Sequence, residues 1–255
     1  MRIFGFFVMS LFLAALSFGQ GAFAADKQST GSDASLVWEM SFKHPGAEMT
    51  ISVAYPQGFG QEADATLGAF AKKQFDEAFE PFRSFIAEKA EEVRVQVSQT
   101  GKLPEEAAGG SWFSKFTYSV ENPSPAFVSV VFDKEEYTGG AHGNRGTFVF
   151  SFNKETGKPL ALTDVFTDVD KAVSELVPLV AKAVQAAKDK DAEPVAADAK
   201  TLDLKMERMA LTANGLRVYY APYEVGSYAE GEFTAEIPKE QLVQLGANPA
   251  IWGGK

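Results

Sequence analysis

Apolar residues recur at every second position in two segments near the start of the chain, residues 36–43 and 50–55, and most residues between them are polar. A period of two is typical of a strand that buries one face. The tetrapeptide His44-Pro45-Gly46-Ala47 between these segments has the composition of a turn. The pattern therefore predicts a β-hairpin.

Residues 62–97 change to a period of three to four, which is typical of a helix with one buried face. The apolar positions on this face are Leu67, Phe70, Ala71, Phe75, Ala78, Phe79, Phe82, Phe85, Ile86, Ala90 and Val93. We interpret these phenylalanines as core residues rather than the lining of a ligand pocket. Pro81 lies within the pattern and lacks a backbone donor, so we expect a kink or a break there.

Strand patterns return in the middle of the chain, after a polar segment at 98–110 that predicts a loop. They cover residues 112–120, 127–132 and 147–152, and the second of these is apolar on both faces, as in a central strand. A polar turn follows at 153–158.

A second helical stripe covers residues 168–188, and Thr167 with Asp170 resembles a capping box at its start. Pro178 lies inside this stripe as a potential breaker. The charged, alanine-rich residues 189–200 predict a solvated linker.

The C-terminal part of the chain predicts a hairpin, a further strand and a short helix. Asn214-Gly215 lies between two apolar runs, which is a strong signal for a hairpin turn. Alternation at 233–237 predicts a strand, and residues 238–245 predict a closing helix. Together the elements predict an α+β fold, with an antiparallel β-sheet packed against two main helices in two consecutive subdomains.

The first 24 residues have the pattern of a secretory signal peptide, with Ala22-Phe23-Ala24 as the cleavage site. An uncleaved membrane anchor is the alternative, although the apolar run is short for a span. Residues 25–35 predict a flexible lead-in. The chain has no cysteine, which suits an exported bacterial protein, so we expect a periplasmic or secreted location without a stable membrane anchor after cleavage. The net charge of −10 disfavours nucleic acid and favours cationic partners.

Motifs for catalysis are weak throughout the sequence. The chain has only two histidines, His44 and His142, and their spacing to acidic residues fits no metal motif. A G-x-S-x-G motif and a phosphate-binding glycine loop do not occur. Asp164 precedes a helix and is explained by capping. We therefore expect no catalytic residues, no cofactor and no metal.

Two segments stand out as candidates for binding. The first is a glycine-rich run with one histidine, and the second holds several tyrosines, which offer large contact areas at low entropic cost. The candidate residues are Tyr137, Gly139, Gly140, His142, Asn144, Tyr223, Glu224 and Tyr228. The alternatives are that His142 only fixes a turn and that the tyrosines only close a sheet edge.

These segments resemble the PdaC/RsiV-like family. The matching motifs are Tyr137 with Gly139-Gly140-Ala141-His142-Gly143, Thr156-Gly157-Lys158 with Leu160, Leu162, Asp164 and Phe166, then Tyr223-Glu224-Val225, Tyr228-Ala229-Glu230-Gly231 and Ile237-Pro238. The resemblance covers residues 36–150 and 160–245. Ser227 departs from the family pattern, in which proline is common.

The family includes the extracytoplasmic part of a lysozyme-sensing anti-sigma factor and the accessory region of a peptidoglycan deacetylase. The resemblance implies an exported, non-catalytic binding protein of the bacterial cell envelope. Its expected partner is a cationic protein such as lysozyme, or a peptidoglycan fragment. A carboxylate-dependent hydrolase acting on peptidoglycan is the alternative, with His142 and Asp164 in its site.

Overall fold

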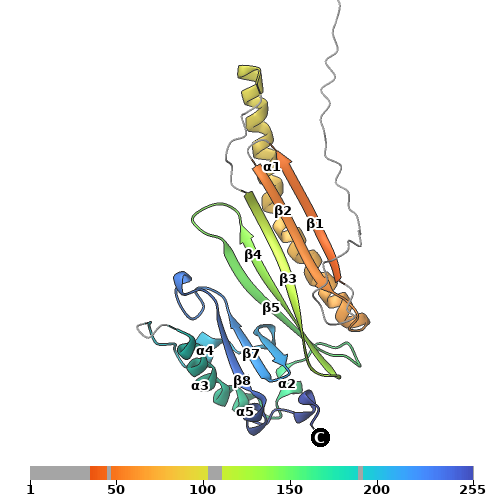
Figure 1. Cartoon of the computed structure of the whole chain (residues 1–255), viewed down its shortest axis with the longest axis vertical. Coiled ribbons are helices and arrows are strands. Elements are labelled where there is room, and N and C mark those ends of the chain that lie inside the picture. Colours follow the sequence, from red (N-terminus) through yellow and green to blue (C-terminus); the bar gives the residue numbers. More distant parts are fainter. Residues whose placement is uncertain (1–34, 45–46, 103–110, 189–191, 255) are drawn as a thin grey trace, which may run out of the picture.

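The structure is a computed structural model that describes residues 35–44, 47–102, 111–188 and 192–254. It contains a five-stranded sheet and a three-stranded sheet, each with its own helices (Figure 1). This arrangement confirms the α+β class. The predicted signal peptide, the lead-in up to residue 34 and most of the 98–110 loop lie outside the described residues.

The large sheet has the strand order β1-β2-β3-β4-β5. Its strands are β1 (Ser35–His44), β2 (Ala47–Pro56), β3 (Ser111–Ser124), β4 (Phe127–Tyr137) and β5 (Asn144–Asn153). The predicted hairpin is confirmed, because β1 pairs antiparallel with β2. The β2–β3 pair is parallel, however, so the sheet is mixed rather than purely antiparallel. The connecting helix returns the chain to the end where β2 began, and this crossover imposes the parallel direction.

That crossover is helix α1 (Gln61–Thr100), which lies along the sheet (Figure 1). Its phenylalanine stripe belongs to the core, as predicted, and Phe70 contacts the rings of Phe116, Phe132, Phe148 and Phe150 at centroid distances from 4.9 to 6.2 Å.

Helix α1 continues through Pro81, so the expected break is wrong. Packing on both sides of the proline explains this result. Phe75 and Ala78 are buried before it and Phe82 after it, and the ring of Phe85 stacks on Trp112 at 4.1 Å. These contacts offset the hydrogen bond that the proline cannot donate.

The small sheet is antiparallel, with the order β6-β7-β8. Its strands are β6 (Met209–Thr212), β7 (Gly215–Tyr220) and β8 (Phe233–Pro238). Helices α3 (Val169–Ala187) and α5 (Lys239–Gln244) pack against it, and α2 (Leu162–Val165) and α4 (Ala199–Leu202) are short. The hairpin at Asn214-Gly215, the strand at 233–237 and both helices are confirmed.

Two details of the second predicted helix differ from expectation. Its N-cap is Asp168, whose side chain accepts a hydrogen bond from the Lys171 amide at 3.1 Å, in place of a Thr167–Asp170 box. The helix also continues through Pro178. Among the described residues, no helix is long and apolar enough to cross a membrane.

The two sheets meet where strand β6 packs on β4 and β5. Val131, Val149 and Ala210 form a small buried cluster at this junction. Next to it, the amide of Leu211 donates a hydrogen bond to Ser129 Oγ at 3.0 Å. This junction fixes the position of the loops at the end of the large sheet relative to those of the small sheet.

Candidate functional site

The glycine-rich segment is the loop between β4 and β5. Gly139 and Gly140 have φ angles of 94° and 92°, which residues with a side chain rarely adopt. The hydroxyl of Tyr137 donates a hydrogen bond to the carbonyl of Gly140 at 3.0 Å, which closes the loop on itself. The loop leaves the His142 side chain exposed.

The tyrosine-rich segment is the connection between β7 and β8, residues 221–232, which we call the tyrosine loop. Tyr223 lies in the first part of this loop with a φ angle of 73°, and 67% of its surface is exposed. A positive φ is unfavourable for tyrosine, so the surrounding contacts must hold this residue in place.

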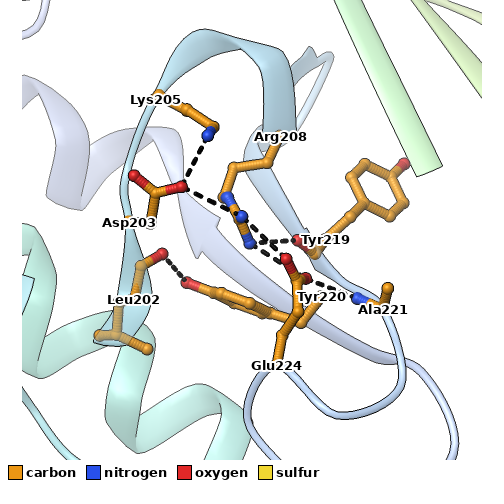
Figure 2. A network of polar contacts seen from close by, with 8 residues as sticks. All are labelled: Leu202, Asp203, Lys205, Arg208, Tyr219, Tyr220, Ala221 and Glu224. Carbon is orange, nitrogen blue, oxygen red and sulfur yellow. Dashed lines mark hydrogen bonds and ion pairs between the residues drawn. The ribbon is translucent and has the colours of Figure 1, made fainter. Parts of the chain in front are cut away.

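Glu224 provides one of these contacts. Its two carboxylate oxygens accept hydrogen bonds from Arg208 at 2.9 and 3.1 Å, and one of them also accepts the amide of Ala221 at 2.7 Å (Figure 2). Arg208 in turn contacts Asp203 at 3.3 Å and the carbonyl of Tyr219 at 3.4 Å. Glu224 is therefore an anchor of the loop, and its expected contact with a ligand stays a prediction.

Three of the predicted site residues come together between the two loops. The rings of His142 and Tyr228 stack with centroids 3.8 Å apart, and the ring of Tyr223 lies 5.5 Å from Tyr228. Tyr228 also donates a hydrogen bond to the carbonyl of Gly143 at 2.7 Å. We call His142, Tyr223 and Tyr228 the aromatic platform.

The remaining predicted residues surround this platform without joining it. Tyr137 packs beside Phe113 at a centroid distance of 6.5 Å and shapes the glycine loop. Asn144 begins strand β5, paired with Glu136 of β4, and is exposed. Whether these residues bind a ligand stays a prediction.

A charged groove of about 310 Å³ lies between strands β3, β4 and β5 and the last residue of the tyrosine loop, and sequence reasoning missed it. Its lining residues are Lys115, Thr117, Asp133, Lys134, Glu135, Arg145 and Glu232. Arg145 pairs with Glu135 at 3.0 Å and approaches Glu232 at 3.8 Å. The charged residues at the end of β4, where Asp133 and Glu135 are exposed, could have indicated part of this groove from the sequence. Glu232 could not have been found in this way, because it lies in the tyrosine loop, far from β4 in the sequence.

The pKa values of two groove carboxyls are raised. Burial raises the pKa of Asp133, a hydrogen bond from Thr147 lowers it, and repulsion by Glu135 raises it again. Burial also raises the pKa of Glu232, and repulsion by Asp133 and Glu135 opposes the favourable charge of Arg145. Burial is the largest cause of both shifts, and the lining holds three carboxylates and three cationic side chains.

The residues considered for metal or acid–base chemistry do not gather. In the described part of the chain, no three His, Asp or Glu side chains are grouped as metal ligands. The carboxylate of Asp164 accepts the amide of Ala161 at 2.8 Å, which is the local capping that we expected.

Comparison with known proteins agrees with these motifs. Residues 44–145 match the family model described as "Deacetylase PdaC", and residues 163–240 match that of "Protein of unknown function (DUF3298)". In these two segments the chain is similar to the PdaC and DUF3298 families. It is 23% identical over 204 residues to the peptidoglycan-N-acetylmuramic acid deacetylase PdaC of Bacillus subtilis strain 168, and the match covers 78% of this chain but only 39% of that protein.

The fold has relatives among solved structures. A DUF3298 family member from Bacteroides fragilis NCTC 9343 aligns with a TM-score of 0.56 at 20% identity, covering 88% of this chain and 98% of that one. A DUF3298 family protein from Pseudomonas aeruginosa PAO1 aligns with a TM-score of 0.48 at 15% identity, covering 86% and 97%. At this level of identity the first similarity shows a shared fold.

Proposed function

We propose that this PdaC-like chain is an exported, non-catalytic binding protein of the cell envelope that recognises a cationic protein. The observation that carries this proposal is the aromatic platform. The loops that supply it come from different sheets, yet they place His142 and Tyr228 in a stack with the exposed ring of Tyr223 beside it.

The platform has the properties of a protein-recognition surface. Tyrosine rings offer large, rigid contact areas, and their faces attract lysine and arginine side chains. Tyr228 is fixed by its hydrogen bond to Gly143, so little side-chain freedom would be lost on binding.

Charge supports a cationic partner rather than a neutral one. The chain carries a net charge of −10, whereas the groove lining itself is balanced, with three carboxylates and three cationic side chains. Complementary charge accelerates association and suppresses wrong partners. Lysozyme, a cationic muramidase, is the specific candidate that we put forward.

The location in the envelope rests on the relative from Bacillus subtilis, whose name states that it acts on peptidoglycan. The match covers the minor part of that protein, so its deacetylase activity is not transferred to this chain. The envelope setting is what we carry over, together with the signal peptide that the sequence predicts.

The test is a titration of the chain lacking residues 1–24 with lysozyme, at low and at physiological ionic strength. We expect Tyr223→Ala to weaken binding about tenfold, as hot-spot tyrosines do. Val37→Ala, which shortens an exposed apolar side chain on β1, is the control and should leave affinity unchanged. A parent chain that fails to bind at low ionic strength would refute lysozyme as the partner.

The groove has its own variants. Asp133→Asn with Glu232→Gln should slow association and reduce its dependence on salt. Asp76→Asn with Glu80→Gln removes the same charge from exposed positions on α1 and serves as the matched control. Equal effects of both pairs would show that only net charge matters and that the groove has no specific role.

A cell-wall glycan is the second candidate, because the exposed face of Tyr223 is also suited to stacking on a sugar ring. Sedimentation with purified peptidoglycan tests it, and loss of co-sedimentation in Tyr223→Ala would support it. The hydrolase alternative would use Asp164 and His142. The carboxylate of Asp164, however, accepts the amide of Ala161 in a local cap, and the ring of His142 stacks on Tyr228.

A further inference from the structure

Lys188 is a charged side chain in an almost fully buried position. It follows helix α3, and only 2% of its side chain is exposed. Its ammonium group donates a hydrogen bond to the carbonyl of Val225 at 2.8 Å and lies 3.1 Å from a carboxylate oxygen of Glu230. It also lies over the ring of Phe233 at 5.4 Å.

A buried ammonium group is costly, so a lysine in such a place requires specific partners. Both oxygen partners of Lys188 belong to the tyrosine loop. Glu230 also accepts hydrogen bonds from the amide and hydroxyl of Ser227, at 2.7 and 3.0 Å. The Ser227 amide, followed by Lys188 and then the Ser227 hydroxyl, lowers the pKa of Glu230, which keeps the carboxylate charged.

The position of these contacts in the loop is informative. Arg208 holds Glu224, which precedes Tyr228, and Lys188 holds Glu230, which follows it. The ring that stacks on His142 is therefore anchored on both sides from the body of the small sheet. The Arg208 anchor is partly exposed, whereas the Lys188 anchor is buried.

We propose that Lys188 is a positioning residue for the aromatic platform: it holds the tyrosine loop so that Tyr228 stacks on His142. This inference rests on the proposed function for its biological meaning, but the positioning itself can be measured without any ligand. If the loop is released, only a fraction of the molecules presents the platform. The apparent association constant is then the intrinsic constant multiplied by that fraction.

The decisive variant is Lys188→Met, which keeps an unbranched side chain, shorter by one atom, and removes its charge. The readout is the proton NMR spectrum of the His142 imidazole, because the stacked ring of Tyr228 displaces its signals. The chain has two histidines, so a His142→Gln variant assigns them. We expect the His142 signals to move towards free-imidazole values in Lys188→Met.

The control is Lys72→Met, which removes a lysine from an exposed ion pair with Asp76 on α1 and should leave the His142 signals unchanged. Glu230→Gln is the second variant, and it is used in place of Lys188→Met if that variant does not fold. It weakens the same contact, so it should shift the His142 signals in the same direction. The double variant should show no more than the larger single effect, because both changes break one pair.

The outcomes separate the two proposals. Unchanged His142 signals in a folded Lys188→Met or Glu230→Gln variant would overturn the positioning role. A parent chain that binds neither lysozyme nor peptidoglycan would refute the proposed function and leave the NMR result intact. If the parent binds, we expect about tenfold weaker apparent affinity in Lys188→Met, corresponding to about a tenth of molecules with the platform formed.

Discussion

Replacing Ser129 by alanine should test how the two sheets are held together. The hydroxyl of Ser129 is fully buried, accepts the amide of Leu211 at 3.0 Å and lies 2.7 Å from the hydroxyl of Ser151. Leu211 belongs to β6, an edge strand of the small sheet. Its amide points away from β7, so Ser129 supplies the acceptor that a neighbouring strand would otherwise provide.

The magnitude follows from the groups that lose their partners. In Ser129→Ala the Leu211 amide stays buried without an acceptor, which costs about 1 to 3 kcal/mol. The lost hydrogen bond to Ser151 adds about 1 kcal/mol. We therefore expect the free energy of unfolding to fall by about 2 to 4 kcal/mol. Ser151→Ala leaves the Leu211 bond intact and should cost only about 1 kcal/mol.

Urea denaturation followed by circular dichroism measures these differences. Ser119→Ala is the control, because Ser119 is exposed on the adjacent strand β3, and its effect should be within about 0.5 kcal/mol. If Ser129→Ala costs no more than Ser119→Ala, the Leu211 amide is satisfied by water in solution. The reasoning about the junction would then be wrong.

Two further predictions concern the hairpin and the groove. In Gly215→Ala the new Cβ would lie 2.1 Å from the carbonyl oxygen of Ile237, so urea denaturation should show a loss of about 3 kcal/mol, and a loss below about 1 kcal/mol would contradict this close packing. Asp133→Asn should stabilise the fold slightly at neutral pH, by less than about 1 kcal/mol because the site is partly exposed. Because burial raises the pKa of Asp133 in the folded state, its charged carboxylate destabilises the fold at pH values above that pKa. The stability gained in Asp133→Asn should therefore disappear as pH falls below 3.8, the ordinary pKa of aspartate. A gain in stability that persists at such low pH would refute this prediction.

Local sequence patterns predicted most of the individual elements. The alternation in 36–55 and 233–237 and the Asn214-Gly215 turn correspond to strands and a hairpin in the structure. These features depend on neighbouring residues, whose periodicity decides which face is buried. The same reasoning identified the phenylalanine stripe of α1 as core.

Features that depend on distant residues were not predictable in this way. The parallel direction of β3 follows from the long crossover helix, and nothing within β2 or β3 specifies it. The local rule for Pro81 predicted a kink or a break, but the helix does not break there, because packing against the sheet outweighs the lost hydrogen bond. In both cases tertiary contacts decided the result.

In the candidate site, too, the sequence identified individual residues but not the contacts between distant ones. Composition singled out His142 and Tyr228 separately, but Tyr228 and the carbonyl that it contacts, that of Gly143, are 85 residues apart. Their meeting depends on the junction at Ser129, which places the small sheet, and on Lys188, which places the loop. No periodicity marks a lysine after a helix as buried. The geometry of the platform thus depends on buried contacts made by residues outside it. Sequence motifs identified the rings of the platform, but they could not identify the contacts that bring these rings together.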